Sequence, residues 1–222
     1  KPKGSDGLHN PSNDQRTGNC TNPIDEQQTY NTLYIGGRLG LDNILKESAF
    51  RFTRFWDAFG SAENRFVAKP SLEFDFVEQK IRTDFVLDYI SGSFDQNLDK
   101  TASIKYGFTN VGFQPSIKIH KDDLTINAGV GLFYSAAQEA GESKFFVYPQ
   151  VTGSYKIVGD LMILYAGLEG TLQQNSYHDF VQENFYISPT VAVAPTNQKF
   201  DFFAGLRIVY RNRNRIFIER IK

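Results

Sequence analysis

The chain has 222 residues, of which 41% are hydrophobic, 22% are charged and 14% are aromatic, and its formal net charge is −1. This length suits a single all-β domain or one barrel. The near-neutral charge argues against a nucleic-acid-binding protein, because such proteins gain affinity by neutralising phosphates with Lys and Arg. No run of 18 apolar residues occurs, so no transmembrane helix is predicted. The composition still suits a transmembrane β-barrel, in which only alternate residues of each strand face lipid.

The N-terminal segment, residues 1–31, contains few apolar side chains and many turn formers, which predicts an extended or disordered arm. Its Cys20 is the single cysteine, and it follows polar residues rather than an apolar signal segment, so we interpret it as an incidental thiol. The chain does not begin with Met and shows no leader pattern. We therefore expect a mature form or a piece of a longer chain, with barrel strands in residues 32–212 and a basic tail, non-native or incomplete, in 213–222.

Apolar residues recur at every second position from Thr32 onward, which is the period of a β-strand with two different faces. The ten strands that this pattern predicts are 33–41, 47–56, 66–76, 81–94, 102–119, 124–135, 143–158, 161–173, 185–194 and 199–211. In the fifth, apolar residues occupy even positions up to Phe108 and odd positions from Val111. This change predicts a β-bulge at Thr109–Asn110, with a tight turn between two short strands as the alternative.

The predicted connections alternate between short and long along the whole series. The short ones are 42–46, 78–80, 121–123, 159–160 and 195–198, and the long, polar ones are 57–65, 95–101, 136–142 and 174–184. This alternation predicts an antiparallel up-and-down meander of about ten strands, with short turns at one rim and longer loops at the other, as in outer-membrane barrels.

Two further features favour lipid over a protein core as the environment of the apolar face. The predicted strands have 9 to 18 residues, whereas globular strands average about 5–6 and spanning strands need about 9–11. Aromatic residues gather where strands meet the long connections, and a thinner set that includes Phe200 and Phe202 is predicted near the short turns. We therefore predict a transmembrane β-barrel or part of a larger one. The alternative is a soluble barrel with its apolar face inside.

Four segments between Asp42 and Leu206 join such strands and turns: "LDNILKESAFRFTRFWDAFGSAENRFVAKPSLEF", "KYGFTNVGFQPSIKIHKDD", "SKFFVYPQVTGSYKIVGDLMILYAGLEG" and "ISPTVAVAPTNQKFDFFAGL". They resemble outer-membrane β-barrel proteins of Bacteroidota that are described as TonB-dependent-receptor-like. The resemblance implies a bacterial outer-membrane location and a role in nutrient uptake or envelope assembly. Its implied partners are outer-membrane lipid and the TonB system or a surface lipoprotein.

The chain departs from that family at both ends. Neither the N-terminal plug domain nor the TonB-contacting segment of a full receptor is found, and the C-terminal sequence "RIVYRNRNRIFIERIK" does not end on an aromatic residue. We therefore expect an incomplete barrel: an open, curled sheet with free edges at Leu33–Leu41 and near Lys199–Tyr210. The alternative is a closed ten-stranded barrel in which the strands at Leu33–Leu41 and Lys199–Arg211 pair.

The polar residues that alternate with the apolar ones are the candidates to line the interior. The lumen-facing candidates are Lys105, Lys118, Lys144, Gln150, Lys156 and Glu169, and the outer-loop binding candidates are Trp56, Tyr177, His178 and Asp179. No catalytic, cofactor or metal site is predicted, and His120 in "HKDD" is interpreted as part of a solvated turn. We expect a non-enzymatic outer-membrane barrel, or part of one, that serves solute transport or receptor binding. The alternatives are a structural or assembly subunit without its own solute and an outer-membrane hydrolase built around His178.

Overall fold

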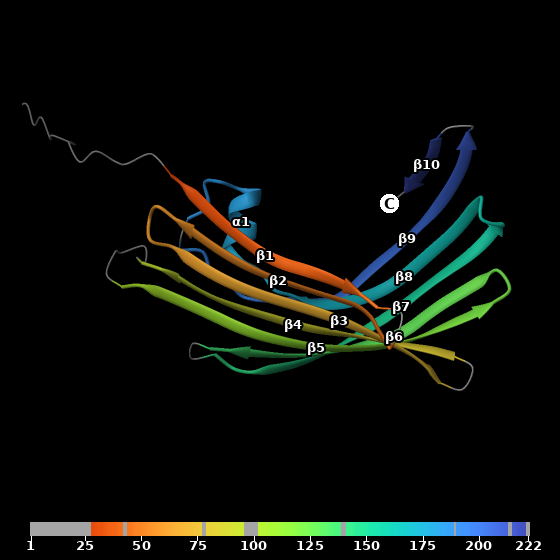
Figure 1. The fold of residues 1–222 in the computed structure, drawn as a ribbon, viewed down its shortest axis with the longest axis horizontal. Coiled ribbons are helices and arrows are strands. Elements are labelled where there is room, and N and C mark those ends of the chain that lie inside the picture. Colours follow the sequence, from red (N-terminus) through yellow and green to blue (C-terminus); the bar gives the residue numbers. More distant parts are fainter. Residues whose placement is uncertain are drawn as a thin grey trace, which may run out of the picture.

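The computed structural model describes residues 28–41, 44–76, 79–95, 102–138, 141–188, 190–212 and 215–220. They form one antiparallel sheet of ten strands in the order β1 to β10, each strand paired with its neighbours in sequence. The elements are β1 (Tyr30–Gly40), β2 (Leu45–Asp57), β3 (Ala62–Phe76), β4 (Gln79–Phe94), β5 (Ile104–Lys121), β6 (Leu124–Ala137), β7 (Lys144–Val158), β8 (Met162–Gln173), α1 (Tyr177–Glu183), β9 (Thr196–Asn212) and β10 (Arg215–Arg220). Figure 1 shows that the sheet is curved like a trough, with α1 on its concave side.

The predicted all-β meander is confirmed, and two parts of the strand assignment are wrong. Residues 185–194 form no strand, since the chain instead makes α1 and then an irregular return to β9. Their alternating apolar residues pack against the concave side rather than pairing in the sheet. The predicted basic tail contains β10, which pairs with β9 between Arg207 and Asn212. The predicted arm, residues 1–31, lies outside the described residues up to position 27, and β1 already begins at Tyr30.

The connections define two ends of the sheet, and they alternate in length as predicted except for the first two, which have four residues each. The short-turn end carries the connections 41–44, 77–78, 122–123, 159–161 and 213–214, and the long-loop end carries 58–61, 95–103, 138–143 and 174–195. The first of these long connections is tighter than expected. The Asp57 carboxylate caps it by accepting hydrogen bonds from the backbone N–H groups of Phe59 and Ser61, at 2.9 and 2.8 Å. Gly60 between them has φ +82°, which a residue with a Cβ rarely adopts.

The sheet is open in the part of the chain that the structure describes. β1 pairs only with β2, and β10 pairs only with β9. The predicted free edge at β1 is therefore confirmed, whereas the last strand at the other edge is β10 rather than β9. Within the described ranges, no helix has the length and apolarity to cross a membrane.

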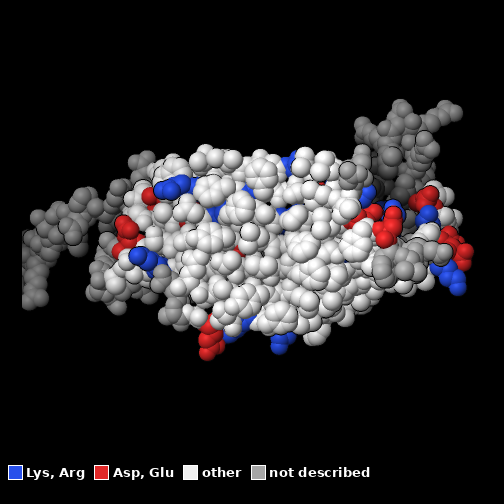
Figure 2. Space-filling model, turned by 60° about the horizontal axis from the view of Figure 1, so that its bottom comes forward, with Lys and Arg blue, Asp and Glu red and all other residues white. Residues whose placement is uncertain are grey.

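The two faces of the sheet have opposite character, and the apolar one is the convex one. Cross-strand partners such as Phe113 and Leu132, or Leu132 and Val147, share this face because opposite residues of paired strands point to the same side. Figure 2 shows this face nearly free of charged residues, which gather at the two rims. Its exposed large residues include Leu33, Ile35, Leu39, Phe50, Phe74, Leu87, Val111, Phe113, Ile119, Leu124, Tyr134, Phe145, Val147, Val151, Tyr155, Leu164 and Phe202. Phe200 and Phe202 lie toward the long-loop end, not at a short turn as predicted, because β9 begins at Thr196.

The predicted bulge at Thr109–Asn110 is wrong, and so is the alternative of two short strands. β5 pairs with β4 from Phe94↔Ile104 to Lys80↔Lys118 without a shift in register. The change in apolar parity instead marks a change of face: from Val111 onward the apolar residues point to the convex side. Nearer the long-loop end, Ile104, Tyr106 and Phe108 point to the concave side, where they join the core beneath α1.

Candidate functional site

A compact aromatic core fills the concave side at the long-loop end. Its buried residues come from β2, β4, β5, α1 and the return segment: Phe55, Ile90, Phe94, Tyr106, Tyr177, Val181 and Val193. The Tyr177 ring packs edge-on against Phe94 at 5.0 Å and against Phe55 at 5.5 Å between centroids. Edge-to-face contacts of this kind add to the gain from burial. The core thus holds α1 against the sheet.

α1 begins at a buried carboxylate that belongs to β3. Glu63, 2% exposed, accepts hydrogen bonds from the Ser176 hydroxyl at 2.7 Å, the Tyr177 backbone N–H at 2.7 Å and the Tyr106 hydroxyl at 2.6 Å. Ser176 is the N-cap of α1, and its Oγ also accepts from the Asp179 N–H at 3.2 Å. A carboxylate near the first turn of a helix also interacts favourably with the helix dipole. Glu63 therefore fixes the position where α1 starts.

A second anchor joins α1 to the sheet through Arg65 of β3. Its guanidinium donates two bonds to the Asp88 carboxylate, at 3.0 and 2.7 Å, one to Asp179 at 2.9 Å and one to the Gln174 carbonyl at 3.3 Å. The fork geometry of arginine matches a carboxylate in this way. One side chain thus ties β4, the end of β8 and α1 together.

His178 connects α1 to the edge strand β1. Its Nε2 lies 2.8 Å from the Tyr34 hydroxyl and 3.1 Å from the Gln182 amide nitrogen. The hydrogen bond from His178 and the nearby Arg65 guanidinium hold the pKa of Asp179 below its usual range. Burial, together with Asp57, raises the pKa of Tyr177, so its hydroxyl stays protonated and donates to Asp57 at 3.1 Å.

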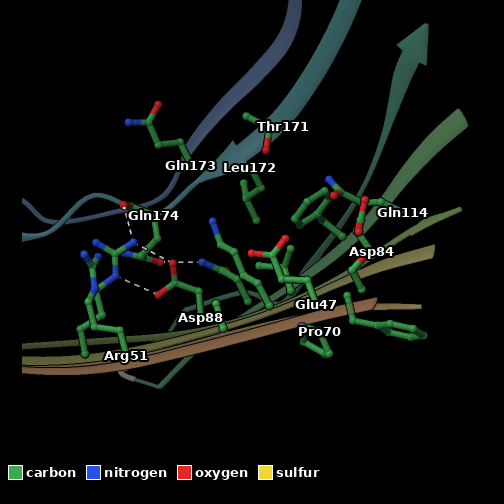
Figure 3. Close-up of a pocket in the computed structure, with 18 of the residues that line it drawn as sticks. Glu47, Arg51, Pro70, Asp84, Asp88, Gln114, Thr171, Leu172, Gln173 and Gln174 are labelled. Atoms are coloured by element: carbon green, nitrogen blue, oxygen red, sulfur yellow. Dashed lines mark hydrogen bonds and ion pairs between the residues drawn. The ribbon is translucent and has the colours of Figure 1, made fainter. Parts of the chain in front are cut away.

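A polar cavity of about 670 Å³ lies beside this anchor on the concave face. Figure 3 shows the end of β8 and the following Gln174 on one side of the cavity, with Asp88 and Glu47 on the other. The curvature of the sheet brings the two walls together, and Asn110 of β5 donates to the Gln174 side-chain carbonyl at 2.6 Å. Five cationic side chains line the cavity, Arg38, Arg51, Arg65, Lys69 and Arg82, with four acidic ones, Glu47, Asp84, Asp88 and Asp179. The volume is in the range of small-molecule sites.

The predicted lumen residues do not gather in this cavity. Gln150 and Glu169 are cross-strand partners that line a smaller cavity of about 230 Å³ together with Asp201. Lys118, Lys144 and Lys156 share the concave side of their strands but lie outside both cavities. Lys105 lies on the convex side, contrary to the prediction, because the parity of β5 was assigned to the wrong face.

The predicted outer-loop residues divide between the two faces. Trp56 is on the convex side, with the Arg54 guanidinium 6.0 Å from its ring. Tyr177, His178 and Asp179 belong to α1 on the concave side, where Tyr177 and His178 are buried. The structure gives no support to the hydrolase alternative at these residues, since the Ser176 hydroxyl donates to Glu63 rather than to His178. Among the described residues, no group of His, Cys, Asp and Glu side chains has the arrangement of a metal site.

The sequence interpretation missed the residues that define the cavity and the anchor, namely Arg51, Glu63, Arg65, Lys69, Asp88 and Asn110. Charged residues on the polar face of β2 to β4 were a signal for them, since Glu63, Arg65 and Lys69 alternate along one strand. The helix had a signal too. Ser176 followed by Asp179 is a start pattern of the capping-box type.

Comparisons with known proteins found no matching family model, no curated protein and no solved structure with significant similarity to the chain.

Proposed function

We propose that the chain forms part of the wall of a β-barrel in a bacterial outer membrane and serves solute transport or receptor binding. The observation that carries this proposal is the inverted polarity of the sheet. Its convex face is apolar between two charged rims, and its concave face is polar and ionic outside the aromatic core beneath α1. A soluble barrel buries the apolar face, whereas a barrel in lipid exposes it.

The strand lengths agree with this environment. β3 to β9 have 12 to 18 residues, and about 9–11 tilted residues cross a bilayer. Exposed aromatic residues lie near the long-loop rim, as in Tyr134 and Phe145, where aromatic side chains suit the membrane interface. The concave face would then line an aqueous space in which α1 covers part of the long-loop end.

Vesicle insertion tests the environment, and solute flux tests the role. The chain is refolded from urea into phospholipid vesicles, and the vesicles are floated through a density gradient and washed with carbonate. We expect the protein to float with the lipid and to show β-type circular dichroism. A monodisperse protein that stays in solution without detergent or lipid would contradict the membrane proposal. Release of a small entrapped dye from the same vesicles would support transport.

A structural or assembly role is the second candidate, favoured by the fixed position of α1. Buried hydrogen bonds to Glu63 and Arg65 hold this helix on the concave side, so it obstructs part of the interior. Inserted protein that releases no solute, even with residues 174–195 replaced by a short Gly-Ser linker, would favour this role.

A further inference from the structure

We propose that the 670 Å³ cavity binds a small hydroxylated anion, of the class of sugar phosphates and sugar acids. This deepens the proposed transport or receptor role and rests on it for its biological meaning. The binding chemistry itself depends only on the residues of the cavity.

The ion pairs of the cavity leave two cations without a partner. Glu47 pairs with Arg38 at 3.1 Å, Asp84 pairs with Arg82 at 3.0 Å, and Asp88 and Asp179 both pair with Arg65 at 2.7 and 2.9 Å. All four carboxylates are therefore engaged by three cations. Within the described ranges, Arg51 and Lys69 make no ion pair.

Arg51 and Lys69 stand on adjacent strands, close enough to act on one ligand. Arg51 is opposite Val67 in the β2–β3 register, and Lys69 is the next residue on the same face of β3. Diagonal neighbours of this kind lie about 7–8 Å apart at the backbone, within the reach of long side chains. A guanidinium with a free fork and an ammonium beside it suit a phosphate or a carboxylate.

Two of the residues that line the cavity each have a buried polar atom without a partner among the described residues, which points to hydroxyl groups on the ligand. Asn110 is 2% exposed, and its side-chain oxygen makes no hydrogen bond to the described residues. The orientation of the Asn110 amide follows from its neighbour. The Gln174 amide nitrogen donates to the Asn175 carbonyl, so the Gln174 side-chain oxygen faces Asn110 and accepts from the Asn110 nitrogen. The Asn110 oxygen therefore needs a donor, such as a hydroxyl group of the ligand.

The second such atom is the hydroxyl of Ser71, a cavity residue that is 5% exposed, and this hydroxyl has no hydrogen-bond partner in the part of the chain that the structure describes. A buried polar group without a partner costs about 1–3 kcal/mol, and a polyhydroxylated ligand supplies both a donor and an acceptor. Phe133 and Leu172 add an apolar surface to one side of the cavity. The combination of two free cations, one free acceptor and one free hydroxyl defines the ligand class.

Isothermal titration calorimetry on the protein folded in detergent micelles tests the proposal. The probes are glucose 6-phosphate, glucuronate, inorganic phosphate and glucose. We expect glucose 6-phosphate or glucuronate to bind at least tenfold more tightly than phosphate and than glucose, and the preferred one identifies the anionic group. Affinities for phosphate equal to those for both sugar anions, or no binding of either sugar anion at millimolar concentration, would overturn it.

Three variants locate the site. Arg51→Gln should weaken binding of the preferred sugar anion about tenfold or more, whereas Lys118→Gln, which removes the same charge from the concave face outside the cavity, should leave it unchanged. Ser71→Ala should weaken binding several-fold without lowering the unfolding midpoint, because the hydroxyl has no partner to lose. Equal effects of Arg51→Gln and Lys118→Gln would mean that binding depends only on the overall positive charge of the concave face, and would refute the site. Binding in micelles and insertion into vesicles are measured separately, so the ligand proposal and the membrane proposal can each fail without the other.

Discussion

The two ends of the concave face use the same alternating strands in different ways. At the long-loop end, aromatic residues and α1 build a dry core around Phe55, Phe94 and Tyr177. At the short-turn end, the same face carries exposed ion pairs such as Glu73–Lys80, at 3.5 Å, and no buried apolar cluster occurs among the described residues. The convex face is apolar at both ends. The concave face is therefore packed as a protein core at one end only, and the stability of the sheet should be unevenly distributed.

The largest effect should come from removing an aromatic residue of the core. Phe94→Ala is expected to lower the free energy of unfolding by about 3–5 kcal/mol, because Phe94 is 1% exposed and packs against Tyr177 and Tyr106. Phe203→Ala on the concave side of β9 should cost about 1 kcal/mol, since that ring is only partly buried. Urea unfolding followed by Trp56 emission measures both. Equal costs would show that the two ends are packed alike.

The next effect concerns the buried carboxylate at the start of α1. Glu63→Ala should cost about 3 kcal/mol, because it leaves the hydroxyls of Tyr106 and Ser176 and the Tyr177 N–H without an acceptor. Glu63→Gln keeps one oxygen and should cost less than half as much. Hydrogen exchange of residues 174–195 should rise sharply in Glu63→Ala, whereas Glu73→Gln on the same strand is the matched control. Unchanged exchange in Glu63→Ala would mean that the carboxylate does not hold the helix.

A charge placed on each face of β8 at the short-turn end distinguishes lipid from water. Leu164→Lys on the convex face should cost about 2 kcal/mol in vesicles, and Tyr165→Lys on the concave face should cost clearly less. Refolding equilibria in phospholipid vesicles give both numbers. A larger cost at Tyr165 would mean that the concave face, rather than the convex face, contacts lipid.

The smallest effect is a dependence on pH that comes from Asp179. The hydrogen bond from His178 and the Arg65 charge lower its pKa in the folded state, so its contribution is complete above the ordinary value of about 3.9. It is lost as pH falls through the lower, folded value, because protonation then weakens the contact. Asp179 is half exposed, so we expect less than about 1 kcal/mol. Comparing the unfolding midpoint of the protein with that of Asp179→Asn at pH 7 and pH 3 checks it: the difference between the two proteins should shrink at pH 3. A difference that grows toward pH 3 would contradict the prediction, because it would mean that protonation of Asp179 strengthens its contribution to stability.

The strands and their antiparallel order could be predicted from the sequence because period-two alternation and turn residues are local signals. The segment 185–194 shows where this fails. Its apolar residues alternate, but Val191 and Val193 pack on the concave core instead of in the sheet. Alternation also does not show which face of a strand is buried, so the change of parity between Phe108 and Val111 predicts a bulge and places Lys105 on the wrong side. A helix of seven residues has only about two turns, which is too short for its apolar residues to show a helical period in the sequence.

The cavity could not be predicted for a different physical reason. Arg51, Asn110 and Gln174 come from β2, β5 and the segment after β8, and only the curvature of the whole sheet brings them together. The charges were visible in the sequence, but their pairing was not. Whether Arg65 pairs with Asp88 and leaves Arg51 free depends on distances that no strand pattern contains.

Three glycines of the concave face each lie opposite an aromatic residue on the neighbouring strand: Gly92 opposite Tyr106, Gly112 opposite Phe133, and Gly167 opposite Phe203. A Cβ at these positions would meet the ring at 2.2, 2.5 and 2.4 Å respectively. Each ring therefore lies down over its glycine, along the wall, instead of standing upright into the interior. The height of these three rings above the sheet is thus set by residues that have no side chain. Any larger residue at these positions would push its partner ring away from the sheet, without changing the charge of the concave face.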